Sequence, residues 1–425
     1  MVYTMNKTVA FHTLGCKLNF SETAALSRQL VQEGFEKRDF TEQADIYVIN
    51  TCSVTENADK ECRHLVRRIQ RKAPASTVVI TGCYAQLKPQ EIASIPGVDL
   101  VLGAAEKFNL AHHLKEFSKG DSTRICSCDA EEIGGFNASF SVDERTRAFL
   151  KVQDGCDYTC SFCTIPLARG KSRSDTIAGA VRNAKELAQK GIKEIVLTGI
   201  NLGDFGKDPE TGARRETFFE LVQALEQVEE IPRYRISSIE PNLLSDEIIR
   251  FVAGSGRFMP HFHIPLQSGS NKILGLMRRR YQRELYIEKV EQIKSLMPHC
   301  AIGVDVIVGF PGETEEDFGD TYRFLHELDV SYLHVFTYSE RARTKALDIQ
   351  PVVPVAVRQE RNKKLRNLSF LKMQHFTRQH EGQKRKILFE SNSRSGLMEG
   401  YSDNYIKVST PYREEWHNQI VEWIL

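Results

Sequence analysis

Short apolar runs alternate with longer segments of helical periodicity along the first part of the chain. Strands are predicted at 8–13, 45–50, 77–81 and 99–102, and helices at 21–31, 56–72 and 105–117. Ser21 is a favourable N-cap residue for the first helix. Strands that alternate with helices favour an open parallel sheet with helices on its faces. We therefore expect an N-terminal α/β domain at residues 6–120.

A second α/β series begins near residue 148. Its predicted strands lie at 148–153, 194–199, 235–239, 261–265, 303–309 and 332–338, with helices between them at 177–189, 218–226, 246–253, 286–296 and 315–326. Six β/α units are too few for a closed eight-stranded barrel, so we predict a partial, open (β/α)6 barrel over residues 142–372. Ligands of such folds bind at the carboxyl ends of the strands.

The remaining segments are more polar. Residues 121–141 carry many acidic groups and are predicted to be a linker with one strand at 124–128. A long polar helix is predicted at 355–380, and strand-like alternation follows it. We expect residues 373–425 to form a small β-barrel of the oligonucleotide-binding type.

Composition narrows the class of protein. The chain has 425 residues, 41% of them hydrophobic, and contains no apolar run of about 18 residues, so no membrane span is expected. Its first residues lack the apolar core of a secretory signal. We expect a cytoplasmic protein, in which ten cysteines are metal ligands or buried thiols rather than disulfides. The net charge is only +1, so nucleic-acid binding would depend on local basic patches.

Three cysteines stand close together directly after the first strand of the second series. Cys156, Cys160 and Cys163 have the spacing C-x3-C-x2-C. Structural zinc requires four ligands, and no fourth Cys or His follows nearby. Three thiolates on a four-iron cluster leave one iron open for a substrate or cofactor. The sequence therefore favours a reactive iron–sulfur cluster, with an RNA-binding protein stabilised by zinc as the alternative.

Cys16, Cys52 and Cys83 each fall just after a predicted strand of the first domain, so three loops could bring them to one edge of the sheet. Position alone leaves a buried structural thiol as the alternative at each of them.

Basic residues are concentrated near the C-terminus. The candidates for contact with RNA phosphates are Arg358, Arg361, Lys363, Lys364, Arg366, Lys384, Arg385 and Lys386, and the helix at 60–72 is also basic. The alternative for any basic run is a solvated helix face.

At these motifs the chain resembles radical S-adenosylmethionine (SAM) enzymes of the methylthiotransferase group. The resemblance is carried by Cys156–Cys163 followed by Thr-Ile-Pro, and by Thr-Leu-Gly-Cys16-Lys-Leu-Asn, Asn-Thr-Cys52-Ser-Val-Thr, Pro-Leu-Gln267-Ser-Gly-Ser and Asp-Val-Ile-Val-Gly309-Phe-Pro-Gly-Glu. It covers almost the whole chain. The sequence motifs around Cys16 and Cys83 are most similar to those of the branch that acts on N6-threonylcarbamoyladenosine at position 37 of tRNA.

The resemblance implies two [4Fe-4S] clusters and SAM. Cys156, Cys160 and Cys163 would hold the cluster that binds and cleaves SAM, and Cys16, Cys52 and Cys83 the cluster that carries the sulfur. Cys62, Cys126, Cys128 and Cys300 would not be ligands. The expected SAM contacts are Thr198, Gly199, Asn201, Gln267, Ser268 and Gly309, with Arg169 or Arg173 on the SAM carboxylate because guanidinium binds carboxylates bidentately.

The same resemblance implies a C-terminal TRAM domain and a tRNA substrate. Methylthio insertion would occur at C2 of the modified adenine, in the anticodon stem-loop of tRNAs that decode ANN codons. An electron donor such as flavodoxin or ferredoxin is expected, and no DNA or membrane partner. Related branches act on isopentenyladenosine or on a ribosomal aspartate, so these remain alternatives. An Arg or Lys should pair with the threonylcarbamoyl carboxylate, but the sequence does not identify it.

Overall fold

The N-terminal domain is a parallel sheet with helices on both faces. The computed structural model describes residues 7–52, 56–120, 122–142, 146–208, 210–390 and 396–425. The strands are β1 (Thr8–Thr13), β2 (Glu36–Arg38), β3 (Ile46–Thr51), β4 (Thr77–Gly82), β5 (Leu100–Leu102) and β6 (Arg124–Cys126), in the order β2-β1-β3-β4-β5-β6. The predicted parallel sheet is confirmed.

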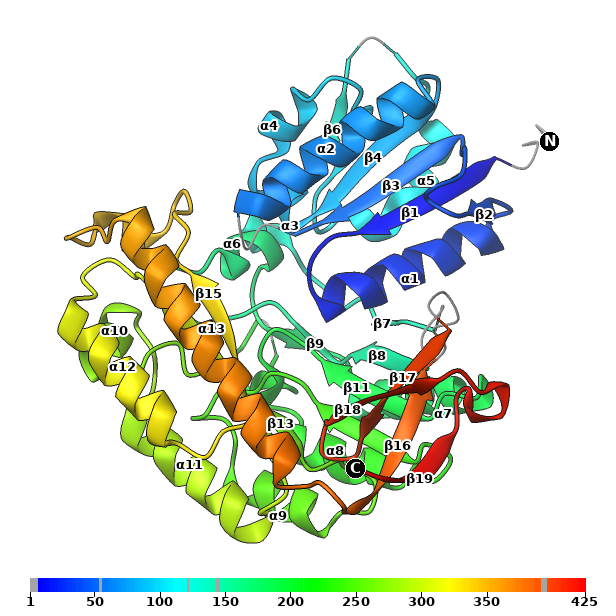
Figure 1. Ribbon diagram of the computed structural model, residues 1–425. Helices are drawn as coiled ribbons and strands as arrows, with labels where there is room; N and C mark the ends of the chain where they lie inside the picture. The colour runs from blue at the N-terminus through cyan, green and yellow to red at the C-terminus, as the bar shows by residue number, and fades with distance from the viewer. Residues whose placement is uncertain (1–6, 53–55, 121, 143–145, 209, 391–395) are drawn as a thin grey trace.

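Two apolar clusters lie on opposite faces of this sheet, because successive strand residues point to opposite sides. One face is covered by α2 (Glu56–Lys72), α3 (Cys83–Leu87) and α4 (Pro89–Ala93), and the other by α1 (Lys17–Gln32) and α5 (Leu110–Glu116) (Figure 1). The first helix begins earlier than predicted, with Cys16 at its N-cap. Ser21 lies inside the helix, where its hydroxyl donates to the Leu18 carbonyl.

The central domain is an open half-barrel of six parallel strands, as predicted. They are β8 (Arg147–Lys151), β11 (Glu194–Thr198), β12 (Arg233–Ile236), β13 (His261–His263), β14 (Ala301–Val308) and β15 (Tyr332–Thr337). Only isolated parallel bridges, such as Ser238 to His263, join β12 to β13. The outer helices are α7 (Ile177–Gln189), α8 (Phe218–Glu226), α9 (Asp246–Gly254), α11 (Arg283–Leu296) and α12 (Glu315–Glu327).

Shorter elements complete the central domain. These are β7 (Ser139–Phe140), which pairs with β8, the β9 (Gln153–Asp154) and β10 (Arg173–Ser174) ribbon, and helices α6 (Ile165–Arg169) and α10 (Asn271–Leu276). Across the described parts of all three regions, 3-10 turns lie at Lys107–Asn109, Ala130–Glu132, Leu202–Asp204, Lys345–Asp348 and Glu414–Trp416. In the part of the chain that the structure describes, no helix could cross a membrane.

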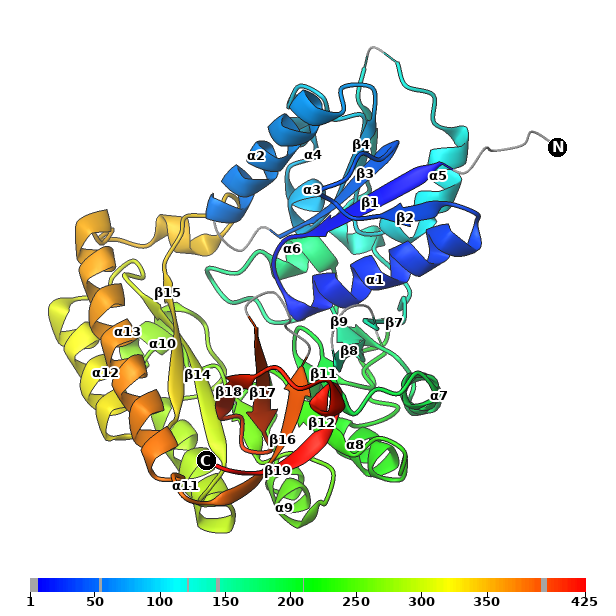
Figure 2. The same ribbon diagram turned by 45° about the vertical axis from the view of Figure 1, so that its right-hand side comes forward.

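The C-terminal region differs from the prediction in two ways. Helix α13 (Val355–Arg378) packs along β15 and continues through the predicted boundary at 372–373 (Figure 2). The strands β16 (Lys384–Glu390), β17 (Leu397–Ser402), β18 (Lys407–Pro411) and β19 (Ile420–Ile424) form an antiparallel sheet in the order β18-β17-β16-β19. Within the described residues β18 and β19 are not paired, so a small antiparallel sheet is present but no closed barrel is seen.

The C-terminal sheet is attached to the barrel by buried arginines of β12. Arg235 donates to the carbonyls of Ser402 and Asp403 at 2.7 and 2.9 Å, and Arg233 donates to that of Lys386 at 2.7 Å. The strand predicted at 124–128 within the linker is present as β6, which pairs with β5 at one edge of the first sheet.

Candidate active site

The first three cysteines meet at the carboxyl edge of adjacent strands. Cys16 follows β1, Cys52 follows β3, and Cys83 follows β4 as the first residue of α3. A Cβ atom on Gly15 would lie 2.8 Å from Cys52 Sγ, so the β1 loop runs directly against Cys52. Gly15 has φ of +101°, which glycine adopts most readily. This close approach of backbone to thiol brings the three cysteines to one edge.

The second trio occupies the loop that leaves the barrel through β8 and β9. The Cys163 N–H donates to the Cys160 carbonyl at 3.1 Å and turns the loop. The backbone N–H groups of Tyr158 and Ile165 point at the sulfurs of Cys156 and Cys163, at 3.4 and 3.5 Å. These donors suit thiolates that carry negative charge when a metal cluster is bound.

A further group of potential metal ligands lies in the barrel. Among the described residues, His263, Asp305 and His334 place their ligand atoms within 4.8 Å of one another.

Burial raises the pKa of the thiols of Cys156 and Cys163 to about 12. These thiols are therefore protonated at neutral pH, and iron must displace their protons on binding. Burial also raises the pKa of Cys62 and Cys300 to about 12, and Cys62 belongs to an apolar cluster beside α2. Burial and raised pKa are shared by these thiols and by Cys156 and Cys163, so they do not separate ligands from inert thiols.

The two trios belong to elements that touch each other. Helix α3 begins at Cys83, and α6 begins two residues after Cys163. These two helices pack together, with α6 just below the N-terminal sheet (Figure 1). The packing places both sets of thiols at the boundary between the first domain and the barrel.

A buried charge network joins the two domains beside these thiols. Glu22 on α1 is fully buried and accepts hydrogen bonds from Arg169 at 3.0 Å and Lys151 at 3.1 Å. Its other oxygen pairs with Lys107 at 2.6 Å. Burial alone would raise the pKa of Glu22, but Arg169 and the two lysines hold it well below its usual range. Glu22 therefore stays ionised.

Asp154 is the second anion of this network. It accepts from Arg169 and Lys151 at 3.0 Å and from Arg173 at 3.2 Å, and these cations hold its pKa well below its usual range despite burial. Arg169 also donates to Asn19 at 2.6 Å. Both guanidiniums are buried and hydrogen-bond within the protein, although the Nε atom of each has no partner among the described residues. Binding of the SAM carboxylate by Arg169 or Arg173 stays a prediction.

A cavity of about 230 Å³ lies beside the second trio. Its walls include the side chains of Phe162, Cys163, Ile307 and Phe336. Arg341 also lines it, and within the described structure its Nε and Nη2 atoms are buried without hydrogen-bond partners, although Nη1 donates to Asp59 at 2.9 Å. Apolar walls with one under-used guanidinium fit a nucleoside that bears a carboxylate. SAM has both features.

Some predicted SAM contacts lie near this loop. Thr198 ends β11, and Gly199 follows it against Gln153. The Asn201 N–H donates to Gln153 Oε1 at 2.8 Å, while Gln153 Nε2 donates to carbonyls of the cysteine loop at 2.9 and 3.0 Å. Gln267 lines the cavity beside Cys163. The loops after β11 and β13 therefore approach the second trio.

Two other predicted SAM contacts have structural roles. Ser268 is fully buried, and its hydroxyl hydrogen-bonds to Thr321 at 3.2 Å. A Cβ on Gly309 would lie 2.2 Å from Arg358 Cγ, and the Gly309 N–H donates to Glu313 at 2.6 Å. Protein atoms fill the surroundings of both residues, and contact of either residue with SAM stays a prediction.

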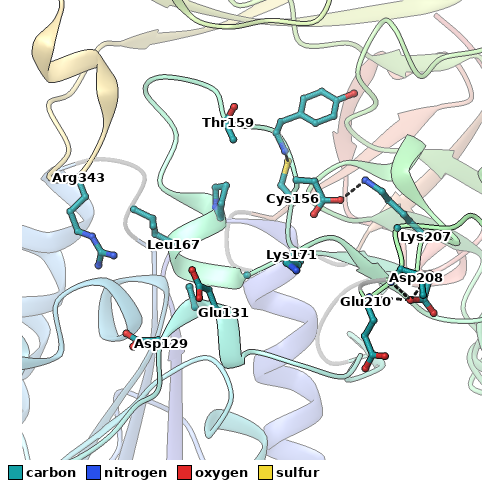
Figure 3. A pocket seen from close by; sticks show the side chains of 17 residues that line it. Asp129, Glu131, Cys156, Thr159, Leu167, Lys171, Lys207, Asp208, Glu210 and Arg343 are labelled. Carbon is teal, nitrogen blue, oxygen red and sulfur yellow. Dashed lines mark hydrogen bonds and ion pairs between the residues drawn. The ribbon is translucent and has the colours of Figure 1, made fainter.

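A larger surface cleft of about 780 Å³ opens on the outer side of the cysteine loop. Cys156 reaches its wall, and charged side chains surround its mouth (Figure 3). Lys207 pairs with Asp157 across one side of this cleft, while Arg343 stands on the opposite side. The cleft gives the loop an opening to solvent.

The basic residues of α13 divide into two groups. Arg358 and Arg361 are buried, and they pair with Glu340 and Glu313 at 2.6 Å in each case. Those guanidiniums hold α13 against the barrel, and contact of Arg358 and Arg361 with RNA stays a prediction. The exposed candidates are Lys363, Lys364, Arg366, Lys384 and Lys386, while Arg385 is partly buried beside Asp403.

Sequence reasoning missed several residues around the thiols. Arg279 donates to Cys160 Sγ at 3.2 Å and pairs with Glu240. Lys17, one residue after Cys16, lines a separate cavity with Arg147. Nothing in the spacing of the motifs indicated that Arg279 would contact the second trio, or that Lys17 of the first domain would share a cavity with Arg147 of the barrel.

Comparisons with known proteins agree with this architecture. Residues 8–103 match a model described as uncharacterized protein family UPF0004, and residues 150–325 match the radical SAM superfamily. The solved structure of the radical SAM methyltransferase TsrM from Kitasatospora setae aligns with a TM-score of 0.59 at 16% identity, covering 80% of this chain and 77% of that chain. This likeness shows the fold.

Relatives with higher identity cover nearly all of the chain. The threonylcarbamoyladenosine tRNA methylthiotransferase MtaB of Bacillus subtilis is 40% identical, covering 98% of this chain and 93% of the relative. The MtaB of Aquifex aeolicus is 41% identical over 93% and 95%. A tRNA-2-methylthio-N(6)-dimethylallyladenosine synthase of Clostridium tetani is 33% identical over 91% and 86%. The chain therefore belongs to the radical SAM methylthiotransferase family, in its MtaB branch.

Proposed function

We propose that the protein is a tRNA methylthiotransferase that inserts a methylthio group at C2 of N6-threonylcarbamoyladenosine at position 37. The observation that carries the proposal is the meeting of two cysteine trios across the packed helices α3 and α6. Two relatives named for this activity share about two fifths of their residues with the chain over nearly its full length.

The residues of the chain would hold the two clusters and orient the first domain against the barrel. Cys16, Cys52 and Cys83 would hold one [4Fe-4S] cluster, and Cys156, Cys160 and Cys163 the other. When bound, the clusters and SAM supply the radical chemistry and the sulfur that an unactivated aromatic C–H bond requires. The buried Glu22 network fixes the position of the first domain on the barrel.

SAM would occupy the cavity beside Cys163. Arg341 joins Arg169 and Arg173 as a candidate for its carboxylate, because Arg341 lines this cavity and its Nε and Nη2 atoms are buried without partners in the described structure. Asn201 and Gln267 remain candidates for further polar contacts. The apolar side chains around them would exclude water from the reacting groups.

The tRNA would contact the exposed basic residues of α13 and β16, which are Lys363, Lys364, Arg366, Lys384 and Lys386. We propose the anticodon stem-loop of ANN-decoding tRNAs as the part that binds, since an unstacked loop base can be extracted into a pocket. A cytoplasmic flavodoxin or ferredoxin is the proposed electron donor, and the cytoplasm is the proposed location.

The proposal is tested with anaerobically reconstituted protein, SAM, a strong reductant and tRNA that carries threonylcarbamoyladenosine. Mass spectrometry should detect the methylthio product, together with 5′-deoxyadenosine and about eight irons per chain. Cys156→Ala should abolish both products, and Cys83→Ala should abolish methylthio transfer alone. Cys128→Ser is the matched control and should keep both.

Three results would contradict the proposal. One zinc and no iron per chain would favour the zinc-stabilised RNA-binding protein. Turnover on isopentenyladenosine tRNA or on a ribosomal aspartate, without turnover on threonylcarbamoyladenosine, would assign the chain to a related branch. Retention of activity in Cys156→Ala would show that the second trio is not the reactive site.

A further inference from the structure

A small cavity lies where all three regions of the chain meet. Its volume is about 220 Å³. Gly15 and Lys17 line it from the first domain, Arg147 and Arg235 from the barrel, and Tyr405 from the C-terminal sheet. Because Lys17 follows Cys16 directly, the cavity opens next to the first cysteine trio. The adenine carbon that receives the methylthio group must reach this place.

Of the three basic side chains that line the cavity, two form ion pairs and Lys17 forms none with the described residues. Arg235 pairs with Glu194 at 2.9 Å, and Arg147 pairs with Glu390 at 2.6 Å. The carboxylates that face Lys17 are Asp305 and Glu194.

Both of these carboxylates are bound elsewhere. Asp305 accepts a hydrogen bond from His263 at 2.7 Å, and Glu194 lies among Arg235, Arg233 and Arg147. Lys17 therefore presents its ammonium to the cavity without a committed anion.

A second polar group in the cavity is also unused. His261 is 5% exposed, and its Nε2 hydrogen-bonds to the Tyr332 hydroxyl at 2.8 Å. Its Nδ1 atom is buried without a hydrogen-bond partner in the described structure. Buried polar groups of this kind are uncommon unless a ligand or water completes them. The cavity is thus lined by a lysine without an ion-pair partner among the described residues and by a histidine with one unpartnered ring nitrogen, which suits a ligand that is both anionic and polar.

We propose that Lys17 binds the carboxylate of the threonylcarbamoyl group and so selects the modified adenosine. This inference rests on the proposed function. The threonyl side chain and its carboxylate fit the volume, and Phe20 and Phe149 supply apolar walls. An ammonium in a confined cavity binds a carboxylate more strongly than one in water. RNA phosphates, the other source of anionic oxygen, are bound mainly by solvated basic surfaces.

The experiment uses the reconstituted full-length protein and two anticodon stem-loops. One carries threonylcarbamoyladenosine, and the other carries its methyl ester, which removes the charge of the group and adds one methyl group to it. kcat/KM is measured for wild type, Lys17→Met and the surface control Lys115→Met. Iron content and 5′-deoxyadenosine formation are recorded for each, so that damage to the clusters is detected.

Wild type should prefer the acid over the ester by on the order of 10²-fold, because a desolvated charged hydrogen bond is lost. Lys17→Met should lose this preference, and Lys115→Met should keep it. An equal loss on both substrates with Lys17→Met would assign Lys17 to a phosphate or to cluster assembly and overturn the inference.

The comparison of the two substrates with wild-type protein tests the inference even if the Lys17→Met variant does not fold. If wild type shows no preference for the acid, the inference about Lys17 is wrong and the proposed function is unaffected. If neither substrate gives a methylthio product, the proposed function is wrong as well.

Discussion

Replacing Glu22 by Gln should destabilise the protein far more than a surface substitution of the same kind. Glu22 is fully buried and contacts Arg169, Lys107 and Lys151 at 2.6–3.1 Å. Loss of its charge leaves these cations under-compensated in a buried site. Removing one partner of a buried ion pair costs about 3–5 kcal/mol.

The matched control lies at the other end of the same helix. Glu33 follows α1 and pairs with Lys115 at 2.6 Å, with both side chains substantially exposed. Glu33→Gln should cost about 0–1 kcal/mol, because solvent screens such pairs.

The assay is anaerobic urea unfolding of both variants and wild type at pH 7, followed by circular dichroism and by tryptophan fluorescence. The two signals separate the N-terminal domain from the rest of the chain, since both tryptophans lie near the C-terminus, at positions 416 and 423. A difference between Glu22→Gln and Glu33→Gln below about 1 kcal/mol would refute the reasoning, because the network would then be as weak as a surface pair.

Three further predictions concern the clusters, pH and RNA. Gly15→Ala places a Cβ 2.4 Å from Cys52 Cβ and should lower iron from about eight to about four per chain by elemental analysis, whereas Gly34→Ala, also at positive φ but with nothing within 4 Å, should not. Burial would raise the pKa of the Asp317 carboxylate, but Lys272 and the hydrogen bonds at the start of α12 lower it to about 2. The ionised carboxylate should therefore stabilise the protein by about 1–2 kcal/mol above pH 4, and this contribution should be lost as the pH falls toward 2. The free energies of unfolding of Asp317→Asn and wild type should converge over this range, and a difference that does not change with pH would contradict the assignment. Lys363→Ala should weaken binding of modified and unmodified tRNA alike and reduce the salt slope by about 1 in filter-binding titrations, and an unchanged slope would remove Lys363 from the interface.

Hydrophobic periodicity predicted the sheets well, because their strands are either buried on both faces or alternate regularly between apolar and polar residues. The strand at 8–13 and the helices at 177–189 and 218–226 have the predicted bounds. The edge strand β2 was missed, because its three exposed residues carry no hydrophobic pattern. The strand β6 was predicted, but its place in the first sheet depends on pairing with β5 across distant sequence.

The charged residues show the limit of sequence reasoning more clearly. Arg169, Arg358 and Lys363 look equivalent in the sequence, yet the first two are buried in ion pairs and the third is exposed. Burial of an arginine depends on whether a carboxylate from a distant segment meets it. Glu22 lies 147 residues from Arg169, and no local pattern connects them.

The unbroken helix α13 has a mechanical consequence. It packs along β15, and residues 379–383 separate its end from β16, so one continuous helix runs from the barrel to the start of the C-terminal sheet. A tRNA held by that sheet would be presented to the barrel at one angle. The orientation of the tRNA would then help to select a single base before the active site contacts that base.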